Sequence, residues 1–263
     1  MQWLDALPLW AVYLAIIACG IATIELGDFL GRYWARHSKA AKKDNVDSLV
    51  AATLALLAFL LVFMTGLANN RFDTRRQLVI AEANAVGTTY LRANFLDEPQ
   101  RSEVRALLRE YVEMRLEAVT RPDRFQQART RSEAIQAQLW QYAEGLGRAA
   151  PTSTTAALFI SAVNNVIDLH TERMAAITNR FPASNWLAIF SVAVLVLLVV
   201  GFNDGLSDGR ADGRGQVVEL VLLLVFASVL LLIIDLDRPR DGLLNVSQQA
   251  MIDLQQQMQA DGP

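Results

Sequence analysis

Cysteine, histidine and lysine are scarce in this sequence of 263 residues, which contains one, two and three of them. The single cysteine, Cys19, excludes an intrachain disulfide and any metal site built from several thiolates. The histidines, His37 and His170, are far apart in the sequence and form no metal-binding spacing. We therefore expect no metal and no cofactor.

Sequence motifs typical of enzymes are also absent. The chain has no phosphate-binding loop of the Walker type, no dinucleotide-binding glycine fingerprint and no nucleophile elbow. We therefore do not expect an enzyme, and we expect no nucleic-acid partner.

One loop contains aspartates at a period of four, Asp204, Asp208 and Asp212, each followed by glycine. Hard cations bind oxygen ligands of this kind. Arg210 and Arg214 are interleaved with the aspartates, however, and the alternate spacing and distal glutamate of an EF-hand are missing. The pattern favours a solvated turn over a metal site.

Long apolar runs are what the sequence does contain: 53% of its residues are hydrophobic and 19% are charged. Four windows approach the roughly 20 apolar residues that a membrane-spanning helix needs. They cover residues 9–26, 49–68, 186–202 and 217–234. The first run lacks the basic flank and the cleavage site of a secretory signal, so we expect it to remain as a span. These patterns predict an all-α membrane protein with four spans.

Between the second and third spans lies a segment of different character, residues 69–183, with 15 arginines, 13 acidic residues and no lysine. Apolar residues recur there at helical spacing, and prolines mark the joints. We expect a water-facing helical bundle, whose first helix continues the second span outward. The predicted organisation is a first transmembrane hairpin (1–68), the bundle (69–183), a second hairpin (184–235) and a C-terminal clasp with a short amphipathic helix (236–263).

The orientation in the membrane is predicted from the lysines and arginines near the span ends. All three lysines, Lys39, Lys42 and Lys43, lie in the loop between the first two spans. With the arginines included, each face has seven basic residues near the span ends. Because long domains cross the membrane largely regardless of their charge, the short lysine-rich loop counts more and slightly favours an extracytoplasmic bundle. We expect a multi-pass membrane protein in contact with membrane lipids.

Acidic residues inside or near the spans are candidates for function, because charge in a bilayer is costly. Glu25 and Asp28 lie near the end of the first span, and Glu219 lies near the start of the fourth. Each is within reach of the headgroups. Interfacial anchoring is the favoured interpretation, and an ion pathway through Glu25 and Asp28 is the alternative.

The largest charged constellation is predicted where the second and fourth spans end on the same face. The candidate ion- or lipid-binding residues are Arg71, Arg75, Arg76 and Arg92; the candidate charge clasp is Glu82, Asp235, Asp237 and Arg238. Acids of one span pair more strongly with arginines of another near a low-dielectric boundary than in water. A structural collar of paired charges is favoured, and a site for an anion or a lipid headgroup is the alternative.

Two local patterns predict close packing near this constellation. Small residues, including Ala83, Ala85 and Gly87, permit another helix to approach the continuation of the second span. After Pro239 has ended the fourth span, the chain reverses and forms a short helix with an apolar stripe. That stripe consists of Met251, Leu254 and Met258.

Three stretches together resemble the bacterial bestrophin-like family: RFDTRRQLVIAEANAVGTTYLR, VIDLHTER and DLDRPRDGLLNVSQQAMIDL. The resemblance extends over nearly the whole chain, although Ala250 stands where a family proline is expected. It implies an oligomeric ion channel of a bacterial inner (cell) membrane, with two spans, a helical cytosolic domain and two more spans. The arginines close to the membrane favour anions over cations. The alternative is a non-conducting membrane scaffold or sensor whose bundle binds a partner protein or lipid headgroups. Small-residue rows and apolar spans also favour a homo-oligomer.

Overall fold

The computed structural model describes residues 7–37, 43–206, 214–239 and 242–261, and these residues form helices joined by short connections without any β-strand. Four helices among them are long and apolar enough to cross a membrane. Each contains one of the four windows predicted from the sequence. The all-α, four-span prediction is therefore confirmed.

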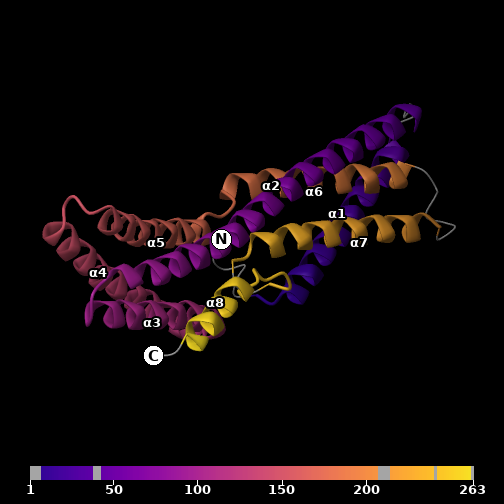
Figure 1. The fold of residues 1–263 in the computed structure, drawn as a ribbon. Coiled ribbons are helices and arrows are strands. Elements are labelled where there is room, and N and C mark those ends of the chain that lie inside the picture. The colour runs from indigo at the N-terminus through magenta and orange to yellow at the C-terminus, as the bar shows by residue number, and fades with distance from the viewer. Residues whose placement is uncertain (1–6, 38–42, 207–213, 240–241, 262–263) are drawn as a thin grey trace. The chain divides into compact units, whose positions relative to one another are not determined.

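The chain divides into two compact units. Unit 1 combines Met1–Arg71 with Arg180–Leu244, and unit 2 combines Phe72–Asn179 with Asn245–Pro263. Unit 1 contains the spanning helices: α1 (Leu9–His37), the first part of α2 (Lys43–Arg92), α6 (Ala183–Leu206) and α7 (Arg214–Asp237). Both α6 and α7 pack on α1, as Figure 1 shows.

Glycines bring α1 and α6 into backbone contact. A Cβ added to Gly27 would collide with the carbonyl oxygen of Leu198 and lie 2.9 Å from the amide nitrogen of Phe202. A Cβ on Gly201 would likewise collide with the carbonyl oxygen of Ile24. Since backbone atoms cannot move aside as side chains do, these positions require glycine.

The helix α2 continues through both units over 50 residues without a break. This confirms the prediction that the second span extends outward as one helix. Gly66 does not interrupt the helix, and a Cβ added there would meet no atom within 4 Å. The helix ends in a short 3-10 turn, Ala93–Phe95.

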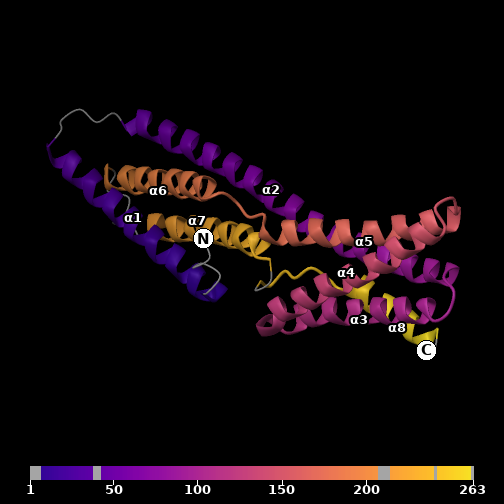
Figure 2. The same cartoon turned by 90° about the vertical axis from the view of Figure 1, so that its left-hand side faces the viewer.

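Unit 2 is a bundle in which α3 packs on α4 and α8, and α4 packs on α5 (Figure 2). The bounds are α3, Gln100–Thr120; α4, Phe125–Ala149; α5, Thr154–Thr178; and α8, Gln249–Ala260. A 3-10 turn, Pro122–Arg124, joins α3 to α4. The hydroxyl of Ser153 accepts a hydrogen bond from the amide of Ala156 at 3.3 Å, which caps α5 as its position after Pro151 predicts.

The core of unit 2 receives side chains from all of its helices, including the second half of α2. The predicted stripe of α8 is buried: Met251, Leu254 and Met258 are at most 8% exposed. A Cβ on Gly87 would lie 3.1 Å from Leu254, so the small residues of α2 make room for α8. The Tyr90 hydroxyl on α2 donates to the carbonyl of Met258 at 3.4 Å and thereby holds the end of α8.

Candidate functional site

The carboxylate of Glu82, on α2, is completely buried in the centre of unit 2. Arg173 of α5 donates from Nη1 to Oε2 at 2.5 Å, and Arg115 of α3 places Nε 3.0 Å from Oε1. Both guanidinium groups are also buried. One carboxylate is therefore shared by two buried cations that come from different helices.

A hydrogen-bonded side-chain network completes this centre. The hydroxyl of Tyr111 donates to Glu82 Oε1 at 2.5 Å, and the amide of Gln136 donates to the Tyr111 oxygen at 3.3 Å. The Nδ1 atom of His170 lies 3.0 Å from the same oxygen. Because the hydroxyl proton already points to Glu82, His170 must donate through Nδ1–H. Its Nε2 atom is buried without a hydrogen-bond partner in the part of the chain that the structure describes.

The electrostatic balance keeps Glu82 ionised. Burial by itself raises the pKa of this carboxyl, but the charges of Arg115 and Arg173, the His170 ring 3.8 Å away and the hydrogen bond from Tyr111 outweigh burial and hold the pKa well below its usual range. Burial and the Glu82 charge raise the pKa of Tyr111 well above its usual range, so its hydroxyl remains a donor. Burial lowers the pKa of Arg173, against the attraction of Glu82.

The same network reaches the C-terminal segment of unit 2. A second nitrogen of Arg173, Nη2, donates to Oε1 of Gln248 at 2.7 Å, immediately before α8. The amide of Gln248 donates in turn to the carbonyl of Val246 at 3.0 Å. The buried centre thus fixes the start of α8 as well as α2, α3, α4 and α5.

A second buried carboxylate, that of Asp237 at the end of α7, lies in unit 1. Its Oδ1 atom accepts a hydrogen bond from the amide of Phe181 at 3.2 Å and lies 3.7 Å from Nη1 of Arg71. Its Oδ2 atom lies 3.4 Å from Nε of Arg180. The Arg71 guanidinium also stacks over the Phe181 ring, 4.2 Å from the ring centre. These contacts join the end of α7 to α2 and to the connection between α5 and α6.

Asp235, the other acid of the proposed clasp, accepts hydrogen bonds from backbone amides within the described part of the chain. Its two carboxylate oxygens accept from the amides of Leu243 and Leu244 at 2.8 and 3.0 Å. A Cβ on Gly242 would collide with Asp235 Oδ1. The carboxylate therefore holds the chain where it leaves α7, and Gly242 permits the close approach.

The remaining arginines of the predicted site are in different environments. Arg75 is buried, with its guanidinium 6.0 Å from the ring centre of Phe72, and Arg76 is exposed. Arg92 donates to the carbonyl of Leu158 at 2.7 Å. Glu82, expected beside the arginines of α2, pairs instead with Arg115 and Arg173, because its face of α2 points into the bundle core.

The acids of α1 differ from each other as well. Asp28 is buried and forms a two-point ion pair with Arg32, at 3.0 and 2.7 Å, whereas Glu25 is exposed. Arg238 donates to the carbonyl of Leu7 at 2.9 Å and ties the end of α7 to the beginning of α1. These residues thus take part in separate contacts within unit 1.

No group of three metal-binding side chains occurs among the described residues. Of the three aspartates expected in a loop, Asp204 lies in the last turn of α6, and Asp208 and Asp212 lie outside the described residues.

Sequence reasoning missed Arg115 and Tyr111 as members of the Glu82 centre. Their signal is weak, because each stands on the apolar face of α3 and reads as a packing position. It also missed the glycines of α1 and α6. Their signal is plain in retrospect, since Gly27 and Gly31, and Gly201 and Gly205, repeat the spacing typical of helix pairs in membranes.

Comparisons with known proteins find a family model that matches most of the chain and solved structures of similar fold. The family model described as Bestrophin-like domain matches residues 18–251. A mutant crystal structure of a bacterial bestrophin homologue from Klebsiella pneumoniae has a TM-score of 0.68 and 15% identity, and the match covers 97% of this chain and 99% of that one. Another structure of a Klebsiella pneumoniae bestrophin homologue, solved by zinc phasing, has a TM-score of 0.66 and 15% identity, and the match covers 95% of this chain and 96% of that one. A crystal structure described only as a membrane protein has a TM-score of 0.67 and 15% identity, and the match covers 96% of this chain and 97% of that one. A search among curated proteins finds no significant match.

Proposed function

Because the chain belongs to the Bestrophin-like family and is a multi-pass membrane protein, we propose that it is the subunit of a homo-oligomeric ion channel, with anions favoured over cations. The family match and the helical fold support an integral membrane role. The exposed face of α2 is the observation that carries the channel proposal.

The apolar window of α2 is the least buried of the four, with 11% of its residues inside the structure. Phe59 and Phe63 are 67% and 57% exposed, and they share a face with Gly66. A spanning helix that leaves so much of its surface uncovered has room for contacts with copies of itself. Packed around an axis, this face gives an apolar throat that gates by wetting.

The same face of α2 becomes polar after the apolar window. Its exposed residues include a row of uncharged hydrogen-bonding side chains: Asn70, Thr74, Gln77, Asn84 and Thr88. Their spacing keeps them in line with Phe59 and Phe63. An apolar throat followed by a polar wall supports a path for ions along this helix.

The proposed preference for anions depends on the arginines of α2. Arg76 is exposed one turn beyond Phe72 and lies beside the face of Phe59 rather than on it, whereas Asp73, which lies on that face, is half-buried. Repeated around an oligomer, an exposed arginine forms a ring of positive charge. Arg71 and Arg92 are held by Asp237 and by the carbonyl of Leu158, so we propose that they shape the path.

Purified protein in liposomes tests the proposal. We expect a chloride-permeable conductance. In a KCl gradient, Arg76→Gln should move its reversal potential from the chloride equilibrium potential toward that of potassium. The matched control is Arg148→Gln, an exposed arginine paired with Glu144 on α4, which should leave the potential unchanged. Tight vesicles that contain correctly folded oligomer would refute the channel.

We also propose the bacterial inner membrane as the location, with unit 2 extracytoplasmic according to the lysine-rich first loop. The resemblance to bestrophins implies the cytoplasmic side instead. A reporter fused after Pro263 that is active only in the cytoplasm would support the second placement and overturn the first.

The alternative function, a scaffold or sensor, is favoured by apolar side chains exposed on unit 2. Trp140 on α4 is 40% exposed, and Leu91 at the end of α2 is 63% exposed. Crosslinking in native membranes should trap a partner at Trp140 if this function is correct. Recovery of contacts only between identical subunits would count against it.

A further inference from the structure

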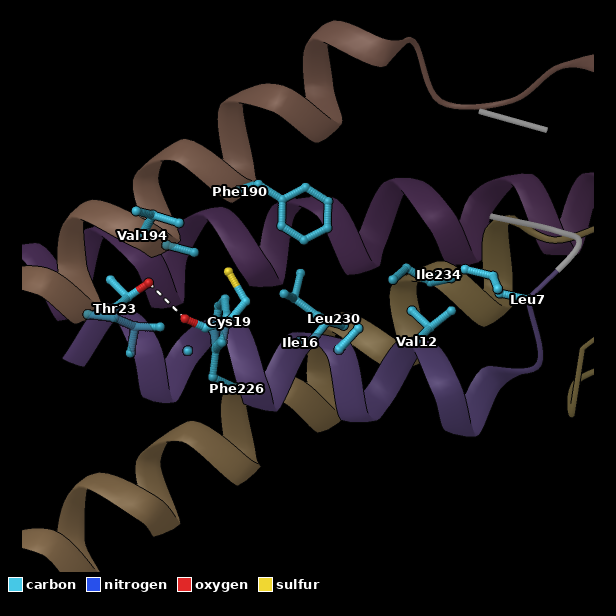
Figure 3. A pocket seen from close by; sticks show the side chains of 14 residues that line it. Leu7, Val12, Ile16, Cys19, Thr23, Phe190, Val194, Phe226, Leu230 and Ile234 are labelled. Carbon is cyan, nitrogen blue, oxygen red and sulfur yellow. Dashed lines mark hydrogen bonds between the residues drawn. The ribbon is translucent and has the colours of Figure 1, made fainter. Parts of the chain in front are cut away.

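Three spanning helices of unit 1, α1, α6 and α7, enclose an apolar cavity of about 230 Å³ (Figure 3). Thr23 of α1 and Leu197 of α6 line one end of the cavity. This end lies one helical turn before Gly27, which touches the backbone of α6. Leu7 and Ile234 stand at the other end. The space is therefore elongated along the helices and lies beside their glycine contact.

The cavity has a buried floor and an accessible mouth. Leu230 and Ile234 of α7 form part of the floor and are 0% and 3% exposed. Val194 of α6 is 39% exposed, and Cys19 of α1 is also exposed. The space consequently opens sideways between α1 and α6, toward whatever surrounds the spanning helices.

Water is a poor occupant of this cavity. Apart from the Cys19 thiol, the side chain of Thr23 is the polar one in the lining, and its hydroxyl donates to the carbonyl of Cys19 at 2.8 Å. A bound water needs two to four polar partners, and apolar cavities stay dry but bind apolar molecules. The lining thus selects a hydrocarbon.

The depth of the cavity identifies the hydrocarbon. Its walls come from apolar windows that the sequence assigns to the bilayer, where the surrounding solvent is lipid acyl chain. An acyl chain is narrow and flexible, as an elongated space with a lateral mouth requires. We propose that one acyl chain of a membrane lipid occupies this cavity. The site is independent of whether the protein conducts ions.

Photolabelling of the intact protein tests the site. The protein is reconstituted in phosphatidylethanolamine and phosphatidylglycerol vesicles that contain phosphatidylglycerol with a diazirine on its acyl chain. After illumination, mass spectrometry should find several-fold more label on peptides around Cys19 and Val194 than around Val225. Val225 is 60% exposed on α7 and is absent from the lining, so it reports ordinary contact with lipid.

A cavity-filling variant sharpens the measurement. Cys19→Phe should remove most of the excess label at Val194 and leave Val225 unchanged. Ala22→Phe is the matched control, because Ala22 is exposed on the same helix but does not line the cavity. If Cys19→Phe does not fold, a competition experiment on the wild-type protein replaces it. Excess unlabelled long-chain lipid should then reduce the label at Val194 more than the label at Val225.

Two results would overturn the proposal. Equal labelling at Val194 and Val225, with no selective competition, would reduce the cavity to ordinary lipid contact. Failure to label the lining, together with disulfide formation between the Cys19 residues of two subunits, would assign the space to a neighbouring copy of the chain.

Discussion

Glu82 and Arg173, separated by 91 positions in the sequence, form a 2.5 Å hydrogen bond between two buried charges. A buried charge that loses its counterion is expensive, because neither water nor another carboxylate replaces it. In unit 2 that counterion is shared, since Arg115 depends on the same carboxylate. The centre therefore makes the stability of three helices depend on one side chain.

We expect Glu82→Gln to destabilise unit 2 by about 3–5 kcal/mol, as the loss of one partner from a buried pair does. Chemical unfolding followed by circular dichroism, with protection of unit 2 from proteolysis, measures the effect. Glu144→Gln is the control, since its partner Arg148 is exposed and the change should be small. Equal stability of the two variants would contradict the role assigned to Glu82.

The lowered pKa of Glu82 predicts a loss of stability in acid. The unfolded chain takes up a proton near the ordinary glutamate pKa of 4.5, whereas the folded chain holds the ionised form to lower pH. Stability is complete above that value and declines progressively as pH falls below it. Hydrogen exchange of unit 2 between pH 7 and pH 3 should show this decline, and Glu82→Gln should lack the part of it that Glu82 causes.

Gly201→Ala should destabilise the pair formed by α1 and α6, because the new methyl group meets the carbonyl oxygen of Ile24. Thermal unfolding in a fixed detergent should show a lower Tm. Gly66→Ala is the opposite case, since its methyl group enters open space on a helix and alanine favours helix by about 0.5–1 kcal/mol. A lower Tm in Gly66→Ala, or an unchanged Tm in Gly201→Ala, would contradict the packing described.

Asp235→Ala should release the turn after α7. The amides of Leu243 and Leu244 lose their acceptors, and because both residues are exposed and water can reach them, the cost is the net value of a hydrogen bond, about 0.5–1.5 kcal/mol for each. Limited proteolysis should cut near Leu243 sooner in the variant than in the wild type. Asp235→Asn should fall between the two, because one acceptor oxygen remains.

The elements were predictable because they depend on local patterns. Apolar windows define the spans, and Pro99, Pro122 and Pro151 mark the joints of the bundle. Ser153 stands where a cap belongs, and the stripe of α8 follows from helical spacing. None of these conclusions required knowledge of which helices are neighbours.

The partners of individual charges were not predictable in the same way. Helical periodicity shows that Glu82 shares a face with Arg75, but not that this face meets α3 and α5. Arg115 and Tyr111 therefore read as ordinary members of an apolar stripe. The glycine contact could be predicted in part, because both helices contain two glycines four residues apart. That spacing does not show which helix each pair of glycines contacts.

Backbone contact between α1 and α6 has a mechanical consequence. Side chains can change rotamer and let two helices slide, whereas carbonyl oxygens packed against Cα atoms allow no such adjustment. Gly31 and Gly205 repeat the contact one turn away, so the pair resists both sliding and rotation. In any conformational change of unit 1, α1 and α6 must therefore move together as one rigid body. Relative motion within the unit must come from the helices that pack against this pair.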